Sequence, residues 1–301
     1  MPHPNARPRR SVLYMPGANP KALEKAKSLA ADTVILDLED AVAPDAKDEA
    51  RGAVATAVKA GGYGKREVVI RVNALASLWG PADLEAAVAA GPDGILFPKI
   101  SSADEVLAAS EAMDALGAPS HIGLWAMIET PLAIMDIKEI AASSLSTRLC
   151  AFVMGTNDLA KETRARQTAD RAPFWFALAA SVTAARLYGL AVIDGVYNDI
   201  ADADGFVRTC KQGRDFGFDG KTLIHPSQIT PCNDVFAPSL EEIAHAHAVI
   251  AAFDEPINAG KGVLTVDGKM TEILHREMAR QTVAIAQAIA AMGNDSDTAK
   301  A

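Results

Sequence analysis

The strongest constraint on the fold is an alternation of short apolar segments with stretches of helical character. Each apolar segment is hydrophobic along nearly its whole length, which is typical of parallel strands covered on both faces. Eight such units in one domain favour a closed (β/α)8 barrel, an α/β fold of the TIM-barrel type, over a doubly wound sheet. We predict strands at residues 11–17, 33–40, 67–73, 94–100, 121–129, 149–155, 191–197 and 220–226. We predict helices near residues 20–30, 46–60, 81–90, 102–116, 132–143, 175–189 and 199–214.

The alternation ends after the sequence HPS at residues 225–227. A helix near 239–253 is expected next, followed by a hairpin whose turn is Asp267-Gly268, and then by a helix at about 271–292. A barrel needs no such extension. We therefore predict two domains, a barrel at 1–237 and an extension at 238–301 that acts as a lid over a barrel mouth or packs on a neighbouring subunit.

Composition excludes several classes of protein. The 301 residues are 50% hydrophobic, which suffices for one large core. A formal charge of −9 gives no general attraction for nucleic acid or an anionic membrane. Three cysteines show no C-x-x-C spacing, and the chain has no apolar run of about 18 residues. We expect a soluble, cytoplasmic protein with reduced thiols.

Ionisable side chains gather where the predicted strands end. The segment TVILDLED closes with Asp37, Glu39 and Asp40. In a barrel the carboxyl ends of all strands meet at one mouth, where such folds carry their active sites. The other polar residues at predicted strand ends are Arg71, Asn73, Lys99, Glu129, Asn157, Asp158, Asp194, Tyr197 and His225.

Two carboxylates follow consecutive strands and predict a metal site. Glu129 ends an apolar strand, where glutamate is unfavourable, and Asp158 follows the next strand. Two such anions tolerate each other best with a divalent cation between them. Mg²⁺ suits two carboxylates and water better than Zn²⁺, which prefers His and Cys. Taken singly, Asp40, Asn157 and Asp194 fit helix caps equally well.

Two basic side chains at strand ends allow two interpretations each. Arg71 forms either a fork for a substrate carboxylate or an ion pair with Glu39 or Asp40. Lys99 at the fourth strand end, or Lys221, would suit the Schiff-base lysine of a class I aldolase. For Lys99 a structural ion pair is the alternative.

Several segments together resemble one known family. The stretches RSVLYMPGANPKALEKA, ADTVILDLEDAVAPDAK, VIRVNALASLWG, GILFPKI, MIET, GTNDLA, IDGVY and GFDGKTLIHPSQI are similar to the citrate lyase β-subunit family. That family includes the malyl-CoA, methylmalyl-CoA and citramalyl-CoA lyases. The resemblance implies a (β/α)8 barrel, usually a trimer or hexamer, with one Mg²⁺. It also implies retro-Claisen cleavage of a 3-hydroxyacyl-CoA thioester into an α-keto acid and an acyl-CoA.

The resemblance also assigns roles to individual residues. Glu129 in MIET and Asp158 in GTNDL correspond to the metal ligands, and Arg71 in IRVN to the arginine that binds the substrate carboxylate. The remaining matches are the acidic pair Glu39 and Asp40, which lines the same mouth, and the turn Gly155, Thr156 and Asn157, which holds the keto-acid product.

The chain departs from the family pattern at two positions. Asn157 stands in GTNDL where the family often has an acid. Glu272 stands in DGKMTE where the lyases usually carry an aspartate, which a neighbouring subunit supplies as catalytic acid/base. Glu272 is therefore our predicted proton donor to the thioester enolate. A malyl-CoA thioesterase on the same scaffold and the β subunit of a citrate lyase complex remain alternatives.

Overall fold

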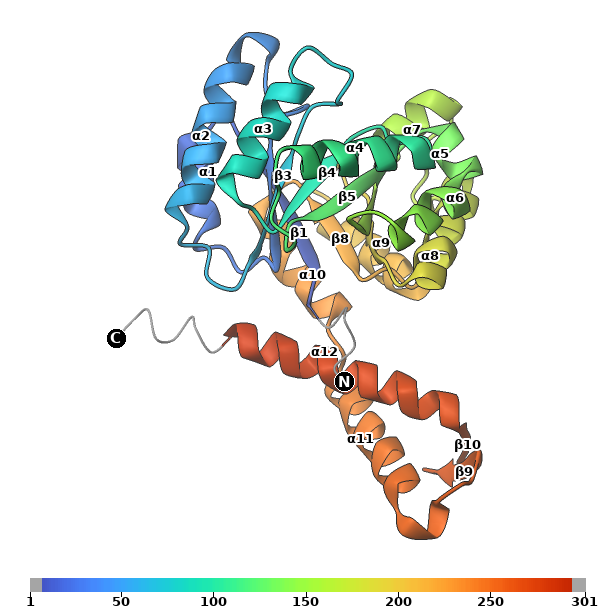
Figure 1. The fold of residues 1–301 in the computed structure, drawn as a ribbon. Coiled ribbons are helices and arrows are strands. Elements are labelled where there is room, and N and C mark those ends of the chain that lie inside the picture. Colours follow the sequence, from blue (N-terminus) through green and yellow to red (C-terminus); the bar gives the residue numbers. More distant parts are fainter. Residues whose placement is uncertain (1–6, 294–301) are drawn as a thin grey trace, which may run out of the picture. The chain divides into compact units, whose positions relative to one another are not determined.

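The computed structural model describes residues 7–293. It divides the chain into two compact units, one spanning Arg9–Phe236 and the other beginning at Ala237. The first unit is a closed barrel of eight parallel strands in sequence order, with helices on the outside (Figure 1). The predicted (β/α)8 fold is thus confirmed. The strands are β1 (Ser11–Pro16), β2 (Thr33–Asp37), β3 (Glu67–Arg71), β4 (Gly94–Phe97), β5 (Gly123–Ile128), β6 (Leu149–Met154), β7 (Ala191–Asp194) and β8 (Gly220–Leu223).

Ten α-helices belong to the described part of the barrel unit. They are α1 (Pro20–Ala26), α2 (Lys47–Ala60), α3 (Gly80–Ala90), α4 (Ala103–Ala115), α5 (Pro131–Met135), α6 (Ile137–Ala142), α7 (Thr156–Thr163), α8 (Trp175–Tyr188), α9 (Ala203–Phe216) and α10 (Ile229–Phe236). α5 begins at Pro131, because the Thr130 hydroxyl caps it by accepting a hydrogen bond from the amide of Ala133. The predicted helix at 132–143 is split at Asp136 into α5 and α6.

The predicted strands were too long at their carboxyl ends by one to three residues. The second was expected at 33–40 but ends at Asp37. Leu38 is buried although it lies beyond the strand, so the apolar pattern continues into the loop. Sequence analysis also missed α7 and α10, which are only eight residues each. Such short helices show little periodicity.

Two separate apolar cores position the residues of the mouth. The larger lies between the strands and the helices, and the smaller fills the barrel interior with side chains that include Val12, Ile35, Val69 and Met127. Side chains in a strand alternate between its two faces. The residues two positions further along therefore also point inward, at the top of the barrel. These residues are Tyr14, Asp37, Arg71 and Glu129.

The second unit contains two helices and a hairpin, where they were predicted. Its elements are α11 (Leu240–Asp254), β9 (Val263–Val266), β10 (Lys269–Glu272) and α12 (Ile273–Gly293). Asp267 and Gly268 both have positive φ, 50° and 75°, as a type I′ hairpin turn requires. A small core of its own includes Val249, Phe253 and Ala279. The lid role of this unit remains a prediction.

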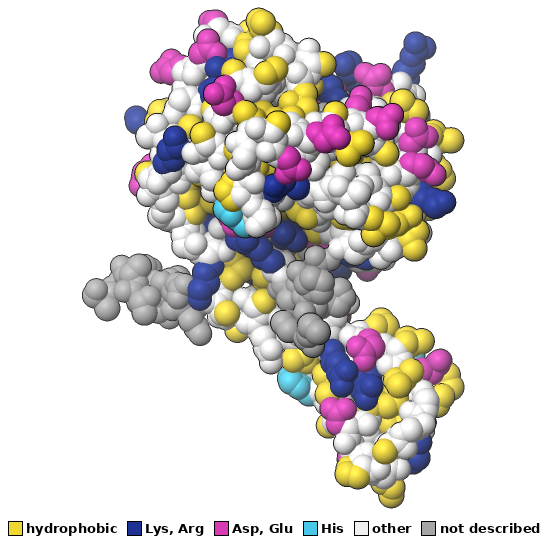
Figure 2. All heavy atoms as spheres, in the orientation of Figure 1, with side chains coloured by type: hydrophobic (Ala, Val, Ile, Leu, Met, Phe, Trp, Pro, Cys, Tyr) yellow, Lys and Arg dark blue, Asp and Glu magenta, His cyan; other side chains and the backbone are white. Residues whose placement is uncertain are grey.

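Charges of both signs are interspersed over the face of the barrel unit drawn in Figure 2. Within residues 7–293, none of the helices combines the length and the apolar character needed to cross a bilayer.

Candidate active site

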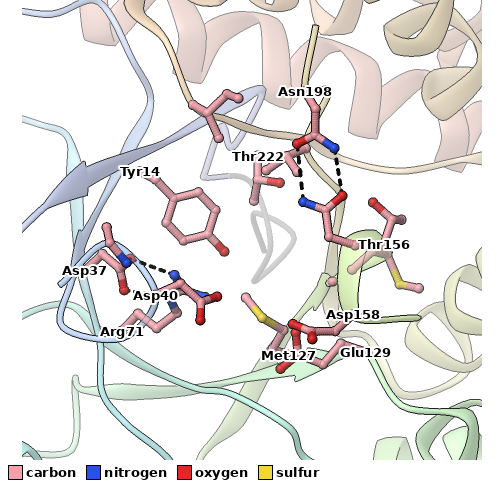
Figure 3. Close-up of a pocket in the computed structure, with 16 residues that line it drawn as sticks. Tyr14, Asp37, Asp40, Arg71, Met127, Glu129, Thr156, Asp158, Asn198 and Thr222 are labelled. Atoms are coloured by element: carbon pink, nitrogen blue, oxygen red, sulfur yellow. Dashed lines mark hydrogen bonds and ion pairs between the residues drawn. The ribbon is translucent and has the colours of Figure 1, made fainter. Parts of the chain in front are cut away.

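A cavity of about 310 Å³ opens at the carboxyl ends of the strands (Figure 3). Its wall combines apolar side chains with several ionisable groups. It brings together residues from the first, second, third, fifth, sixth, seventh and eighth βα units. The polar side chains of the wall are Tyr14, Asp37, Asp40, Arg71, Glu129, Thr156, Asn157, Asp158, Asn198 and Thr222.

Glu129 and Asp158 face the cavity from neighbouring units, and their carboxylates lie side by side in Figure 3. β5 and β6 are paired up to Ile128 and Met154, so the two strands end at the same level. Glu129 is 2% exposed, and Asp158 lies in the first turn of α7. Burial, with the charges of Glu39 and Asp158, raises the pKa of Glu129 to about 8. The positive charge of Lys99 and the hydrogen bond from its backbone amide offset only part of this rise in the pKa.

The local backbone is built around the Glu129 side chain. The amide of Lys99 donates a hydrogen bond of 2.7 Å to Oε1 of Glu129. On the other side, a Cβ atom added to Gly155 would lie 2.4 Å from both Cβ and Oε2 of Glu129. Only glycine leaves room for the carboxylate, so Gly155 and the Lys99 amide together hold it towards the cavity.

This arrangement fits Mg²⁺. Within the part of the chain that the structure describes, no three His, Cys, Asp or Glu side chains form a complete metal cage. Mg²⁺ does not require one, since it usually keeps several waters and takes one or two carboxylates plus substrate oxygens. A buried carboxylate with a raised pKa beside a second carboxylate is the donor pair such an ion would neutralise.

Gly155→Ala should weaken this site by displacing Glu129. The new methyl group must displace the Glu129 side chain, so we expect lower Mg²⁺ affinity and a free energy of unfolding reduced by about 1–3 kcal/mol. Isothermal titration with MgCl₂ and chemical denaturation measure the two effects. The matched control is Gly52→Ala, at an exposed position of helix α2, where nothing outside the helix's own backbone lies within 4 Å of the added carbon. Equal Mg²⁺ affinity in both variants would contradict the assigned geometry.

Arg71 is held by three acids. Its Nε and Nη2 each donate a hydrogen bond of 2.6 Å to Asp37, a partner that sequence analysis did not assign to it. Its Nη1 lies 2.6 Å from Oε2 of Glu39 and 3.3 Å from Oδ2 of Asp40. Sequence analysis named an ion pair with Glu39 or Asp40 as the alternative interpretation of Arg71, and the structure contains both ion pairs. The guanidinium nevertheless also lines the cavity, so a role towards substrate remains a prediction.

The structure gives no support to a Schiff-base lysine. Partial burial acts to lower the pKa of Lys99, but the hydrogen bond and ion pair with Glu39 outweigh it and raise that pKa. A Schiff-base lysine needs the opposite shift, because its amine must be unprotonated to attack a carbonyl. Nζ of Lys99 lies 2.8 Å from Glu39, and neither Lys99 nor Lys221 lines the cavity. Lys221 is fully buried beside Asp194.

Lys47 is a residue of the site that sequence analysis missed. Its buried Nζ donates hydrogen bonds to the carbonyl oxygens of Leu38 and Glu39, at 2.8 and 2.7 Å, and to Oδ1 of Asn73 at 2.9 Å. It therefore fixes the loop that carries Glu39. Little in the sequence indicated this role of Lys47, because a lysine at the start of a helix is usually an ordinary surface residue.

The turn predicted to hold a keto acid lies on the cavity wall. Gly155 precedes α7, and Thr156 and Asn157 are its first two residues. The side chain of Asn157 is exposed and bonded to the amides of Asn198 and Gln167. Glu272 lies at the end of β10 in the second unit, so its proposed contact with substrate remains a prediction.

Fold and mouth together define a barrel enzyme with a carboxylate pair suited to a divalent cation. More narrowly, the chain belongs to the HpcH/HpaI aldolase/citrate lyase family, which matches residues 10–226. A (3S)-malyl-CoA thioesterase of Cereibacter sphaeroides (strain KD131) is 50% identical over 95% of this chain and 97% of its own. Citrate lyase subunit beta of Escherichia coli (strain K12) is 37% identical over 88% of this chain and 89% of its own. The resemblance noted in the sequence is thus confirmed.

Solved structures of CitE are similar to this chain. The protein CitE from Mycobacterium tuberculosis, in complex with magnesium, acetoacetate and coenzyme A, superposes with a TM-score of 0.76. It is 28% identical, and the match covers 94% of this chain and 99% of that one. Another structure of the citrate lyase beta subunit from M. tuberculosis contains oxaloacetate and magnesium.

Proposed function

We propose that this protein hydrolyses a malyl-type CoA thioester with the help of Mg²⁺. The observation that carries the proposal is the pair Glu129 and Asp158, which faces the cavity together with the guanidinium of Arg71. Such a site suits a substrate with a hydroxyl and a carboxylate on adjacent carbons. Similarity favours hydrolysis, since relatives named thioesterase are 48–50% identical and those named citrate lyase subunit beta 34–37%.

In this proposal the metal ion, when bound, polarises the substrate oxygens that it coordinates. Glu129 and Asp158 hold it, and Arg71 attracts the substrate carboxylate. Of the two acids on the cavity wall that are not assigned to the metal, Asp40 is less engaged than Asp37, because its side chain is 66% exposed and its ion pair with Arg71 is the long one at 3.3 Å. It accepts the proton of the attacking water. The C–S bond then breaks, and the sulfur of CoA takes that proton from Asp40 and leaves as a thiol.

Carbon–carbon cleavage is the second candidate. The CitE structures that contain a keto acid or an acetoacetate ion with magnesium favour it. The same groups would bind the substrate, and the hydroxyl would lose its proton to Asp40 as the bond between the hydroxyl carbon and the neighbouring methylene breaks. The thioester enolate would then take a proton from Glu272.

The products separate the two reactions. Incubation of the purified chain with (3S)-malyl-CoA and MgCl₂ should yield malate and free CoA thiol. Glyoxylate and acetyl-CoA would instead establish a lyase. Prior dialysis against EDTA should remove activity and Mg²⁺ should restore it. Activity on a free CoA ester by this chain alone would argue against an obligatory subunit of a citrate lyase complex.

Subunit complementation tests the proposed trimer or hexamer with a shared site. For carbon–carbon cleavage, Glu272→Ala and Asp158→Asn are each expected to be inactive if the lid of one subunit supplies Glu272 to the mouth of the next. Mixing the two variants should then restore part of the activity, because some mouths combine an intact barrel with an intact lid. Demonstrated subunit exchange without recovery would exclude the shared site, and full activity of Glu272→Ala alone would remove Glu272 from the mechanism.

A further inference from the structure

Tyr14 stands at the inner end of the cavity in a fixed orientation. It follows Val12 on the inward face of β1 and packs against the apolar cluster inside the barrel. The guanidinium of Arg71 lies over its ring, with 4.9 Å between Cζ and the ring centroid. Core packing and this cation–π contact hold the ring in place. Figure 3 shows its hydroxyl pointing into the cavity, across from Glu129 and Asp158.

The hydroxyl of Tyr14 has no hydrogen-bond partner among the described residues, unlike most other donors of the wall. The side-chain amides of Asn157 and Asn198 bind each other. The Thr222 hydroxyl donates to the carbonyl oxygen of Asp194. Arg71 is engaged by Asp37 and Glu39. A donor left free while its neighbours are engaged is available to a ligand in the cavity.

The environment keeps this hydroxyl protonated. Burial raises the pKa of Tyr14, and the positive charge of Arg71 offsets only part of that rise. Tyr14 is therefore a neutral donor at physiological pH, not a base or a nucleophile. The acids around the cavity lack this capacity when ionised, because a carboxylate only accepts hydrogen bonds.

We propose that the Tyr14 hydroxyl donates a hydrogen bond to the acyl oxygen of the thioester and stabilises the negative charge that forms there. This inference rests on the proposed function. When water adds to the acyl carbon, the C=O electron pair moves onto that oxygen. It returns when the C–S bond breaks, and Tyr14 keeps its proton throughout. The same oxygen gains charge in the enolate of carbon–carbon cleavage, so the inference applies to either reaction.

Tyr14→Phe removes the donor and keeps the ring under Arg71. We expect kcat to fall by about 100- to 1000-fold, as for the loss of one donor to a developing oxyanion, with KM little changed. Mg²⁺ affinity and the free energy of unfolding should match those of the wild type, which a merely structural role would not predict. The control is Tyr63→Phe, because this buried hydroxyl also lacks a partner among the described residues but does not line the cavity.

Wild-type turnover of (3S)-malyl-CoA is measured first, so that the two proposals fail separately. A wild type without activity on any CoA thioester would overturn the proposed function and this inference with it. Turnover that Tyr14→Phe leaves intact, or a rise in KM at constant kcat, would overturn the inference alone. A loss of kcat in Thr156→Val but not in Tyr14→Phe would assign the donor to Thr156 instead.

Discussion

Glu129→Gln and Asp158→Asn should each abolish Mg²⁺-dependent turnover while the barrel stays folded. Both changes keep the shape of the side chain and remove its charge. The loss of turnover should exceed the roughly 10- to 100-fold loss that is typical when a residue hydrogen-bonded to a metal ligand is replaced. Isothermal titration with MgCl₂ should show the same loss of affinity, independently of any substrate.

The free energy of unfolding shows whether the Glu129→Gln variant is still correctly folded. In the folded, metal-free protein the pKa of Glu129 lies near 8, against an ordinary value of 4.5. The folded protein therefore binds this proton more tightly than the unfolded chain does, so protonation of Glu129 stabilises the fold. This contribution is fully present below about pH 4.5 and is lost as the pH rises through about 8. Glutamine has no such loss, and its side-chain oxygen still accepts from the Lys99 amide. In EDTA at pH 8 the variant should therefore unfold no more readily than the wild type.

A surface carboxylate provides the matched control for this pair. Glu139→Gln alters an exposed residue of α6 and should leave activity and Mg²⁺ affinity unchanged. If Glu129→Gln or Asp158→Asn behaved like this control, the metal site would lie elsewhere in the protein.

The sequence was sufficient to predict the barrel and the place of its mouth. Eight apolar runs predict eight buried parallel strands, and the polar residues at their ends must then converge. The pairing of Arg71 with Asp37 was also within reach. Both lie two positions after an inward apolar residue, on neighbouring strands, and in the structure they are register partners. Side chains in a strand point inward at every second position. Applying this rule to each strand end would have placed Asp37 and Arg71 side by side in the mouth, and Tyr14 in the same mouth.

Other features depend on contacts that no local pattern specifies. Lys99 reaches Glu39 across 60 positions of sequence, and it does so with a positive φ of 56° that its residue type does not suggest. Lys47 donates hydrogen bonds to the carbonyl oxygens of the two residues that directly follow β2. α7 carries Asp158 but is too short for its periodicity to be recognised. Its first turn, not a loop, presents the predicted ligand.

Arg71→Lys should lose most of the activity although the positive charge is kept. The planar guanidinium donates to both oxygens of Asp37 and lies 2.6 Å from Glu39, and a single ammonium cannot reproduce that geometry. Loss of one charge-assisted hydrogen bond to substrate corresponds to about a 10- to 100-fold fall in kcat/KM. The free energy of unfolding should also fall, by less than the 3–5 kcal/mol that is roughly typical of removing one partner of a buried ion pair.

A comparison of two substrates separates these effects. 3-Hydroxybutyryl-CoA has a methyl group in place of the carboxylate of malyl-CoA, so Arg71 has nothing to bind in it. Arg71→Lys should therefore reduce the preference of the wild type for malyl-CoA. Asp37→Asn, which disturbs the same ion pair but keeps the arginine, should preserve that preference even if both rates fall. If Arg71→Lys kept the full preference for the carboxylated substrate, Arg71 would act only through its ion pairs with Asp37 and Glu39.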